Sequence, residues 1–412
     1  MTPDPPSPPT ERTAELAAVI RAEIESSPSR RITFARFMER ALNEPELGYY
    51  QSATDRTTRT GDFLTAPETH AMFGWTVARR LEALWVELGR PAPFRIVEYG
   101  AGSGTLALSI LEGLERHGAK AALDAARYTP VETNPHRLAD LAARFESAGL
   151  AERLDTGNLT PTSTSSGLAG GTSSIGRAAP TPAVLIANEF LDALPVHRVI
   201  VRDGALRELF VAWRDGFVQV VGEPSTPELA ARLAGDGTTL AEGQVAEICL
   251  ELEPWLDEAA SRLERGFALI FDYGYEAAEL YGPRHLAGTL LGYRGHRVVE
   301  DPLTDPGSID LTAHVDFTAV ARLAEARGLR TVSLTSQSAF LVAAGLEAEW
   351  QSLRADPGLT AGSYAAARSA ILRLLDPRHL GAFRVLQLER HPGLAGGGGP
   401  TGGGGPTFPQ SG

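Results

Sequence analysis

The sequence predicts an α/β fold: a doubly wound, mainly parallel sheet with a helical N-terminal region and inserted cap elements. Strand signals alternate with helix signals through the middle of the chain, which is typical of a parallel sheet covered on both faces. The runs "FRIVEY" (94–99), "AVLIA" (183–187) and "GFALIFDY" (266–273) lack polar alternation, as expected for strands buried on both sides. A glycine-rich turn follows the first of these runs.

Composition limits the classes of protein to which the chain can belong. Its 412 residues, 43% of them hydrophobic, suffice for one large α/β domain with insertions or for two domains. A net charge of −13 argues against a general nucleic-acid binder, which needs a basic face, and is compatible with a cationic substrate. The single cysteine, Cys249, excludes an intramolecular disulfide and a zinc cluster of several thiolates.

The same features predict a soluble, cytoplasmic protein. The low cysteine content favours a reducing compartment. The proline-rich start, "MTPDPPSPPT", lacks the pattern of a secretory signal, and no apolar run approaches the length that spans a membrane. We therefore expect neither a nucleic-acid partner nor membrane insertion.

Low-complexity stretches and inserted segments organise the chain. We expect disorder at 1–12 and a disordered Gly/Pro-rich tail at 391–412. Between them we expect a helical N-terminal or cap region at 13–92 and a core at 93–390. The core contains a low-complexity loop at 160–182 and inserted segments at 200–245 and 280–315. Within the first insertion, Asp215-Gly216 lies between β-rich arms and predicts a hairpin over 205–221.

The elements of the core follow in order. After the strand at 94–99, the pattern predicts a helix over 105–117, a strand at 128–132, a helix that begins near Asn134, the strand at 183–187, a helix over 252–264, the strand at 266–273, and late strands at 329–337 and 383–390. Upstream of the core, Thr65 and Glu68 have the spacing of a helix-capping box.

The glycine turn predicts a ligand site. Gly100, Gly102 and Gly104 follow a strand at alternate positions, where glycine allows positive φ and close approach of a ligand to the backbone. The helix that follows directs free N–H groups toward the same place. At the end of the next strand, Glu132 is placed to accept hydrogen bonds from a ribose. A dinucleotide pattern would begin at Gly102, too far beyond the strand.

With Glu98, these glycines form E-x-G-x-G-x-G, which resembles motif I of the class I S-adenosylmethionine-dependent methyltransferases. Further blocks resemble the MidA-type family of these enzymes: "FMERALNEPELGYY" (37–50), "TGDFLTAPETHAMFG" (60–74), "VETNP" (131–135), "IANEFLDALPVHRV" (186–199), "FDYGY" (271–275), "GTLLGYRGH" (288–296) and "DPLTDPGSIDLTAHVDFTAV" (301–320). The blocks cover roughly residues 15 to 390 in order. The resemblance implies a Rossmann-like methyltransferase fold with S-adenosyl-L-methionine as cofactor.

The resemblance also implies roles for individual residues. Cofactor binding is expected of Asp62, Phe63, Glu98, Gly100, Gly102, Gly104, Glu132 and Asn188. Catalysis is expected of Glu189, with Asp192 and Asp272 as helpers, because carboxylates can grip a guanidinium and aim one nitrogen at the methyl group. Contact with the substrate is expected of His314 and Tyr273, and no metal is expected.

Some of these residues also suit plainer roles. Asn188 could cap a helix that exposes Asp192. Among the alternating polar residues Asp310, Thr312, His314 and Asp316, a metal site is conceivable, but Asp316 fits better as the cap of the helix that follows.

The function that the resemblance implies is methylation of a protein arginine. The mitochondrial members of the family are protein-arginine methyltransferases that assist assembly of respiratory complex I, so a subunit of that complex is one expected substrate, and a homodimer is left open. Two alternatives remain at this point: a non-catalytic assembly factor that retains the cofactor fold, and an NAD-linked oxidoreductase. Binding of S-adenosylmethionine against NAD, and methyl transfer detected by mass spectrometry, distinguish the three.

Overall fold

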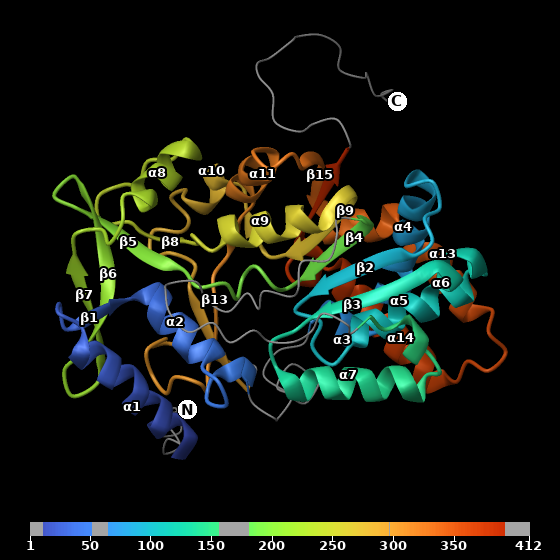
Figure 1. The fold of residues 1–412 in the computed structure, drawn as a ribbon, viewed down its shortest axis with the longest axis horizontal. Helices are drawn as coiled ribbons and strands as arrows, with labels where there is room; N and C mark the ends of the chain where they lie inside the picture. The colour runs from blue at the N-terminus through green and yellow to red at the C-terminus, as the bar shows by residue number, and fades with distance from the viewer. Residues whose placement is uncertain (1–10, 52–64, 156–180, 296, 392–412) are drawn as a thin grey trace, which may run out of the picture.

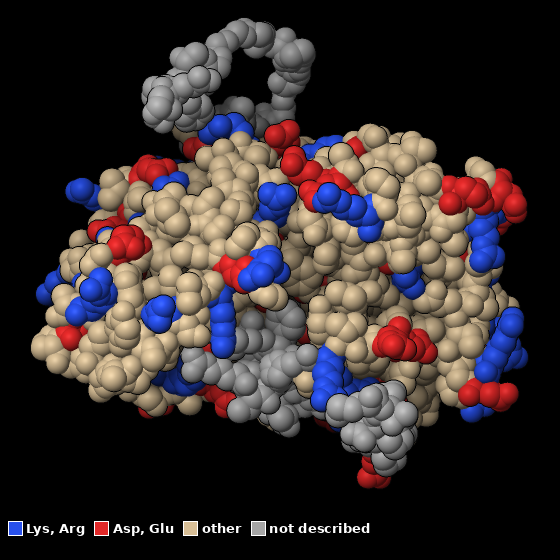
Figure 2. All heavy atoms as spheres, turned by 180° about the vertical axis from the view of Figure 1, so that it is seen from behind, with Lys and Arg blue, Asp and Glu red and all other residues tan. Residues whose placement is uncertain are grey.

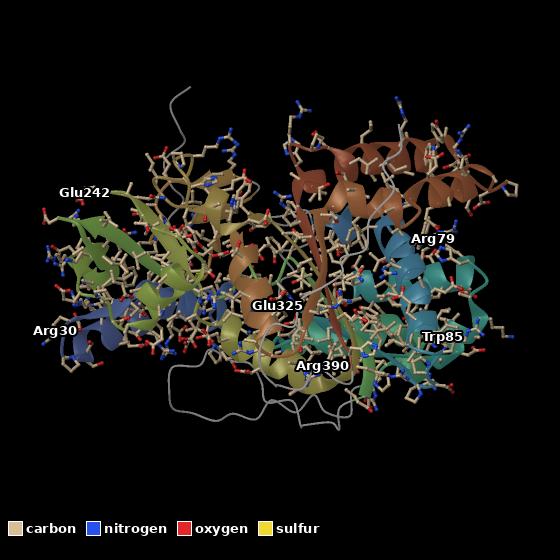
Figure 3. All side chains as sticks on the ribbon, turned by 90° about the horizontal axis from the view of Figure 1, so that it is seen from above. Arg30, Arg79, Trp85, Glu242, Glu325 and Arg390 are labelled. Carbon is tan, nitrogen blue, oxygen red and sulfur yellow. The ribbon has the colours of Figure 1, made fainter. Side chains whose placement is uncertain are left out.

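A computed structural model describes residues 11–51, 65–155, 181–295 and 297–391. Two β-sheets lie side by side along the long axis of the molecule (Figure 1). Arg79 and Trp85 mark the half that holds the larger sheet, while Arg30 and Glu242 mark the other half (Figure 3). None of the described helices is long and apolar enough to cross a membrane.

The larger sheet is the predicted core. Its order is β15 (Arg330–Ser336), β16 (Arg384–Arg390), β9 (Leu263–Asp272), β4 (Thr181–Asn188), β2 (Phe94–Tyr99) and β3 (Ala126–Val131). The strands β3, β2, β4 and β9 are parallel, and β16 runs antiparallel to both of its neighbours. The predicted strands are present, each within a few residues of its expected bounds.

Helices cover both faces of this sheet because alternate strand residues point to opposite sides. One face holds α4 (Met72–Glu87), α5 (Thr105–Arg116), α6 (Lys120–Ala125), α7 (Pro135–Ser147), α12 (Gln337–Ala343), α13 (Leu346–Arg354) and α14 (Ala361–Leu375). The other holds α9 (Leu252–Arg262) and α11 (Phe317–Glu325). The chain therefore winds from β2 to β3 on one face and, after β4, returns on the other.

The smaller sheet is antiparallel and carries most of the first predicted insertion. Its order is β1 (Arg31–Thr33), β6 (Ala205–Trp213), β5 (His197–Arg202) and β8 (Val245–Ile248), with β7 (Phe217–Gly222) paired to β6. The predicted hairpin is the β6–β7 pair, and Asp215 in its turn has φ of 56°. Helices α1 (Glu11–Ser26) and α2 (Phe34–Asn43) pack on one face, and α8 (Glu228–Gly235) and α10 (Ala277–Leu280) on the other.

The N-terminal region expected at 13–92 is divided between the two sheets. Residues 11–51 pack on the smaller sheet and even supply its edge strand β1, whereas α3 (Ala66–Thr69) and α4 pack on the core. Helical periodicity identifies an apolar face but not the surface that covers it, so the sequence could not separate the two parts.

Short elements join the halves. The strands β11 (Leu291–Arg294), β12 (Arg297–Val299) and β13 (Asp310–Thr312) form a small sheet, and β10 (Gly274–Tyr275) pairs with β14 (Val315–Asp316). The remaining elements are the 3-10 turns η1 (Tyr49–Gln51), η2 (Ala151–Arg153) and η3 (Leu380–Ala382). On the face drawn in Figure 2, acidic and basic side chains are interspersed.

Candidate functional site

The candidate site lies where the strand order reverses. Strand β2 has β3 on one side and β4 on the other. Helices α5 and α7 pack on one face of the sheet, whereas α9, which precedes β9, packs on the opposite face. In open α/β sheets, ligands bind beyond the carboxyl ends of the strands at such a reversal. The turn at 100–104 follows β2, the segment from Glu132 to Asn134 follows β3, and the segment from Glu189 to Asp192 follows β4.

The glycine turn has the conformation that its sequence predicts. Gly100, Gly102 and Gly104 have φ of 68°, 54° and 82°, in the left-handed region that favours glycine. A Cβ added to Gly102 would meet none of the described residues within 4 Å, whereas one added to Gly104 would lie 2.8 Å from Leu141. The backbone is therefore open to a ligand at Gly102, while Gly104 provides close packing between helices.

Glu132 closes the turn from the side of β3. Its carboxylate accepts hydrogen bonds from the backbone N–H of Gly102 at 3.0 Å and of Asn134 at 2.8 Å. Helix α7 begins next to Asn134, as predicted, and the Asn134 side chain caps it by accepting from the N–H groups of His136 and Arg137. Glu132 is thus held beside the open part of the glycine turn, a position that suits a ribose ligand.

Glu98 lies below the turn, within the sheet. It is 4% exposed and accepts a hydrogen bond of 2.6 Å from the phenol of Tyr128 on β3. Burial raises the pKa of Glu98 to about 8, the nearby charge of Glu132 raises it further, and the Tyr128 bond opposes both. In this structure the carboxyl group faces the neighbouring strand, so it supports the turn from beneath.

Asp272 anchors the segment that follows β4. Its carboxylate is 0% exposed, and one oxygen accepts from the backbone N–H groups of Phe190, Leu191 and Asp192 at 2.9–3.3 Å. The other oxygen accepts from the N–H of Tyr273. Burial raises the pKa of Asp272 well above its usual range, reinforced by Asp192 and Glu189, while these backbone donors lower it. No helix follows Asn188, because residues 189–196 contain only bends and a turn at 192–193, so interpreting Asn188 as a helix cap is wrong.

Glu189 stands at the head of this segment with φ of 49°, a conformation that is strained for a residue with a side chain. Oxygen Oε1 accepts from the N–H of Ala66 at 3.1 Å and from the amide of Asn188 at 3.3 Å. Thr65 occupies the N-cap position of α3 without a side-chain cap bond, so the predicted capping box is wrong: Glu189 binds the adjacent N–H instead.

The second oxygen of Glu189, Oε2, is buried and has no hydrogen-bond partner among the described residues. Burial raises the pKa of Glu189 to about 8, and the charges of Asp192 and Asp310 add to the effect. A buried acceptor of this kind is costly unless a ligand binds it.

Asp192 contributes a second orphaned oxygen. Its Oδ2 accepts a short hydrogen bond from the Tyr273 phenol, and its Oδ1 is buried without a partner in the described part of the chain. Burial raises the pKa of Asp192 to about 6, against the lowering effect of Tyr273. Tyr273 thus fixes one oxygen of Asp192.

The structure adds two residues from distant parts of the chain. The phenol of Tyr50, on η1, donates to Oδ1 of Asp310 on β13 at 2.6 Å. The charges of both Asp310 and Asp192 raise the pKa of Tyr50, after the larger effect of burial. We call Glu189, Asp192 and Asp310 the acidic cluster.

His314 lies beside this cluster. Its ring packs edge-on against Tyr273 with centroids 5.4 Å apart, and burial, followed by the charge of His285, lowers its pKa to about 4. The imidazole is therefore neutral near pH 7. Asp316 caps α11 by accepting from the N–H of Ala319 at 3.0 Å, which confirms the capping prediction.

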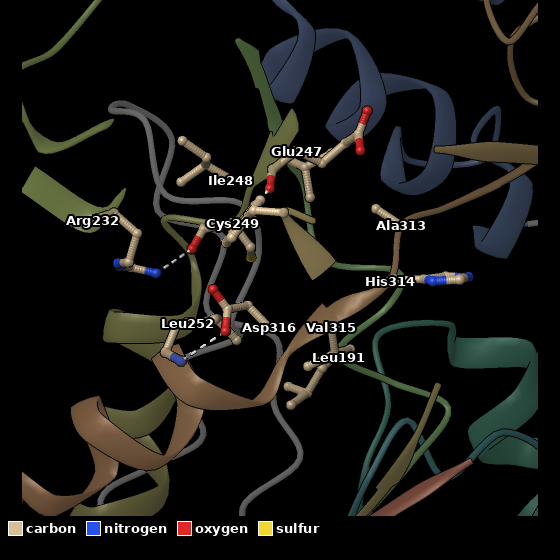
Figure 4. A pocket seen from close by; sticks show the side chains of 13 residues that line it. Leu191, Arg232, Glu247, Ile248, Cys249, Leu252, Ala313, His314, Val315 and Asp316 are labelled. Carbon is tan, nitrogen blue, oxygen red and sulfur yellow. Dashed lines mark hydrogen bonds between the residues drawn. The ribbon is translucent and has the colours of Figure 1, made fainter. Parts of the chain in front are cut away.

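A small cavity lies between β8 of the smaller sheet and the segment at 313–316. It measures about 20 Å³, room for one water molecule, and Leu191, Cys249, His314 and Asp316 are among its lining residues (Figure 4). Burial raises the pKa of Cys249 to about 12, so its thiol stays un-ionised near neutral pH.

The structure thus brings most of the predicted residues to one edge of the core sheet. Asp62 and Phe63 lie outside the described residues. Sequence reasoning missed Tyr50 and gave Asp310 no role in the site, although both lie in blocks that carry the family resemblance, "GYY" at 48–50 and "SIDLT" at 308–312. Their pairing across 260 residues leaves no local signal.

Comparison with known proteins connects this geometry to a family. Residues 76–335 match the family model described as "Putative S-adenosyl-L-methionine-dependent methyltransferase". A crystal structure of a COG1565 superfamily member from Burkholderia thailandensis, bound to S-adenosyl-homocysteine, is 30% identical with a TM-score of 0.79, covering 93% of this chain and 95% of that one. This similarity confirms the predicted fold class.

Named relatives give the same result. The protein arginine methyltransferase NDUFAF7 homolog of Drosophila melanogaster, a mitochondrial protein, is 35% identical over 76% of this chain and 70% of its own length. The mitochondrial protein arginine methyltransferase NDUFAF7 of Rattus norvegicus is 28% identical over 89% of this chain and 84% of its own. The predicted cytoplasmic location is wrong by this comparison. A low cysteine content indicates a reducing environment without distinguishing one reducing compartment from another.

Proposed function

The chain belongs to the family of S-adenosyl-L-methionine-dependent methyltransferases, and from that premise we propose that it methylates an arginine side chain of a protein. The enzyme class and the cofactor follow from the family. The alternatives of a non-catalytic assembly factor and an NAD-linked oxidoreductase are therefore set aside. The arginine acceptor is the proposal.

The residues at the reversal fit the cofactor. The open backbone face at Gly102 and the carboxylate of Glu132 offer a cradle for the methionine part and for the ribose hydroxyls. When bound, S-adenosyl-L-methionine supplies an electrophilic methyl group. The task left to the protein is to hold an acceptor nitrogen in line with that methyl group and to exclude water.

The observation that carries the arginine proposal is the pair of orphaned oxygens. Oε2 of Glu189 and Oδ1 of Asp192 are both buried, and they belong to the one segment that Asp272 fixes beyond β4. A guanidinium presents several N–H donors in a plane and binds carboxylates at two points. Two such acceptors would orient the group and concentrate its electron density on the nitrogen that faces the methyl group.

Electrostatics supports a cationic acceptor. The charges of Asp192 and Asp310 raise the pKa of Glu189, after the larger effect of burial. The described residues place no guanidinium or ammonium within ion-pair distance of Glu189 or Asp192. A bound arginine would offset the repulsion and let Glu189 ionise.

The test compares cells with and without this protein by mass spectrometry of methylarginine, followed by transfer of labelled methyl groups to the candidate acceptor. We expect loss of a methylarginine in the deleted cells, restored by the wild type and by the surface control Glu325→Gln but not by Glu189→Gln. A missing methyllysine or methylated small molecule instead of a methylarginine contradicts the proposal.

The acceptor protein is proposed from the resemblance alone. A subunit of respiratory complex I is the first candidate, and the enzyme would assist assembly of that complex. Transfer to isolated subunits, compared with transfer to an Arg→Lys version of each methylated site, tests this choice. The sequence leaves open whether the protein forms a homodimer, and sedimentation measurements would decide this.

A further inference from the structure

Tyr50 connects the two sides of the site through three different groups. Its phenol donates to Oδ1 of Asp310 at 2.6 Å. Its backbone carbonyl accepts from the side-chain amide of Asn134 at 2.7 Å. Its ring stacks with the guanidinium of Arg137, whose carbon lies 5.7 Å from the ring centroid. One residue of η1 therefore contacts both the segment that follows Glu132 and the strand that carries Asp310.

Asp310 lies near Asp192. It lies opposite Tyr293 in the pairing of β13 with β11. The charges of Asp310 and Asp192 together raise the pKa values of Tyr50 and Tyr293, after burial. The backbone also joins the two segments, because the carbonyl of Asp192 accepts from the N–H of Ala313, three residues beyond Asp310.

We propose that Tyr50 is a positioning residue of the acceptor pocket: its phenol holds Asp310 as the third carboxylate that faces the acceptor and makes the pocket prefer a guanidinium to an ammonium. The proposal rests on the proposed arginine acceptor and deepens it. Asp310 comes from β13 and Tyr50 from the N-terminal region, so the selecting group is supplied by elements outside the core sheet.

The chemistry of the two cations gives the reason for selection. A guanidinium has five N–H donors in a fixed plane, whereas an ammonium has three on a compact point charge. Glu189 and Asp192 offer one orphaned oxygen each. A third carboxylate held at a fixed angle adds an acceptor that a planar, five-donor group can use more fully than an ammonium can.

The phenol is suited to this role because it remains a donor. Burial raises its pKa well above the usual range of a phenol, so the O–H is retained near neutral pH. Substitution by phenylalanine would remove only the bond to Asp310. The backbone bond to Asn134 and the ring face toward Arg137 would remain, so the cofactor side should be left intact.

The test is a comparison of two phenol deletions. Tyr50→Phe removes the donor to Asp310, and Tyr128→Phe removes the matched donor to Glu98 beneath the cofactor turn. Calorimetry would measure the binding of S-adenosylmethionine to each protein, and then of acetyl-arginine amide and acetyl-lysine amide to each protein saturated with S-adenosylhomocysteine.

For Tyr50→Phe we expect roughly tenfold weaker binding of the arginine probe, a change within about twofold for the lysine probe, and cofactor affinity within about twofold of wild type. Tyr128→Phe should show the reverse: weaker cofactor binding and an unchanged preference between the probes. A merely structural role for Tyr50 would weaken both probes and the cofactor together.

Asp310→Asn provides the second variant. It should lose the same preference, and the double variant with Tyr50→Phe should lose little more, because both changes remove one interaction. If wild type prefers the arginine probe and both single variants keep that preference, the role of Tyr50 is overturned while the proposed function stands. If wild type itself shows no preference, the arginine acceptor and the present inference fail together.

Discussion

Glu189 combines three unfavourable features in one residue. It has a left-handed backbone, a buried carboxyl group and an oxygen without a partner among the described residues. Each feature costs stability, and groups of this kind persist where function requires them. Replacement by glutamine keeps the size and the hydrogen bond from Ala66 while removing the ionisable proton.

Glu189→Gln should make the protein more stable at alkaline pH. The pKa of Glu189 is raised from 4.5 to about 8, with burial as the main cause. As pH rises through this window, the unfolded chain releases the proton and the folded protein retains it, so the stability of the wild type falls. The variant lacks this loss. We expect its Tm to exceed that of the wild type by about 2 °C or more at pH 8 and to match it near pH 4.5.

Differential scanning fluorimetry at the two pH values measures this effect, with Glu325→Gln as the exposed control. Equal Tm differences at both pH values would mean that the carboxyl group does not titrate in the raised range.

The pH dependence of catalysis should follow the acidic cluster. Gripping a guanidinium requires ionised carboxylates, and the pKa values of Asp192 and Glu189 are raised to about 6 and about 8. We therefore expect kcat/KM for an arginine acceptor to rise between pH 6 and pH 8 and then level off. Affinity for the cofactor, measured by calorimetry in the same buffers, should change much less. A profile that falls across this interval contradicts the requirement for ionised groups.

Glu132→Gln tests the ribose position. The carboxylate accepts from the N–H groups of Gly102 and Asn134 with one oxygen each. The amide keeps one acceptor oxygen for one of these N–H groups and turns its NH2 donor toward the other. We expect cofactor affinity to fall roughly tenfold to a hundredfold. The acceptor probe should bind as before to protein saturated with S-adenosylhomocysteine. Unchanged cofactor affinity would remove Glu132 from the binding site.

At the scale of single elements, a glycine can be required for its backbone conformation or for the space that it leaves to a ligand, and the glycine turn allows the two reasons to be distinguished. Gly102 and Gly118 both have positive φ, 54° and 69°, and at either position an added Cβ would meet no atom within 4 Å in the part of the chain that the structure describes. Gly118 ends the turn after α5, away from the site. Replacement by alanine would therefore strain the backbone equally at the two positions, but only at Gly102 would the added methyl group lie in the candidate site.

Both Gly102→Ala and Gly118→Ala should lose about 1–2 kcal/mol of stability, because each places a side chain in the left-handed region. Only Gly102→Ala should weaken cofactor binding, by roughly tenfold or more, because its methyl group enters the open face of the turn. Urea unfolding and calorimetry measure the two effects. Equal loss of affinity in both variants would show that strain, rather than occupied space, is responsible.

The core elements could be predicted because their signals are local. The apolar runs at 94–99, 183–187 and 266–273 are short and unalternating, and each became a strand covered on both faces. The role of Asp272 was harder to predict from the sequence. The sequence suggests a helper in catalysis, whereas its carboxylate accepts from four backbone N–H groups and fixes the segment that bears Glu189. Backbone donors leave no mark in a sequence.

At the scale of the whole molecule, the site is assembled from segments far apart in the chain. Glu189 binds Ala66 across 123 residues, and Tyr50 binds Asp310 across 260. Family resemblance can mark such blocks as belonging to a site, but it cannot say which pairs meet. Periodicity likewise could not show that residues 11–51 pack on the smaller sheet.

The smaller sheet supports the site through Glu247. This buried carboxylate on β8 pairs with Arg198 at 3.0 Å and accepts from the backbone N–H of Thr289 at 2.6 Å. The hydroxyl of Thr289 in turn accepts from the N–H of His314. A continuous path therefore runs from the antiparallel sheet to the segment between Asp310 and Asp316, which borders the acidic cluster.

Glu247→Gln should break the connection between the smaller sheet and the segment that contains His314. We expect a loss of about 1–3 kcal/mol in unfolding free energy, because the amide cannot satisfy both Arg198 and Thr289. Methyl transfer to an arginine acceptor should slow severalfold, whereas cofactor affinity, which depends on the core sheet, should stay within about twofold.

The control is Glu253→Gln. Glu253 is 48% exposed and forms a 2.8 Å ion pair with Arg232, so its replacement should change stability by less than about 1 kcal/mol. If Glu247→Gln weakens cofactor binding as much as it slows transfer, the two sheets act as one unit and the smaller sheet has no separate role in positioning the acceptor.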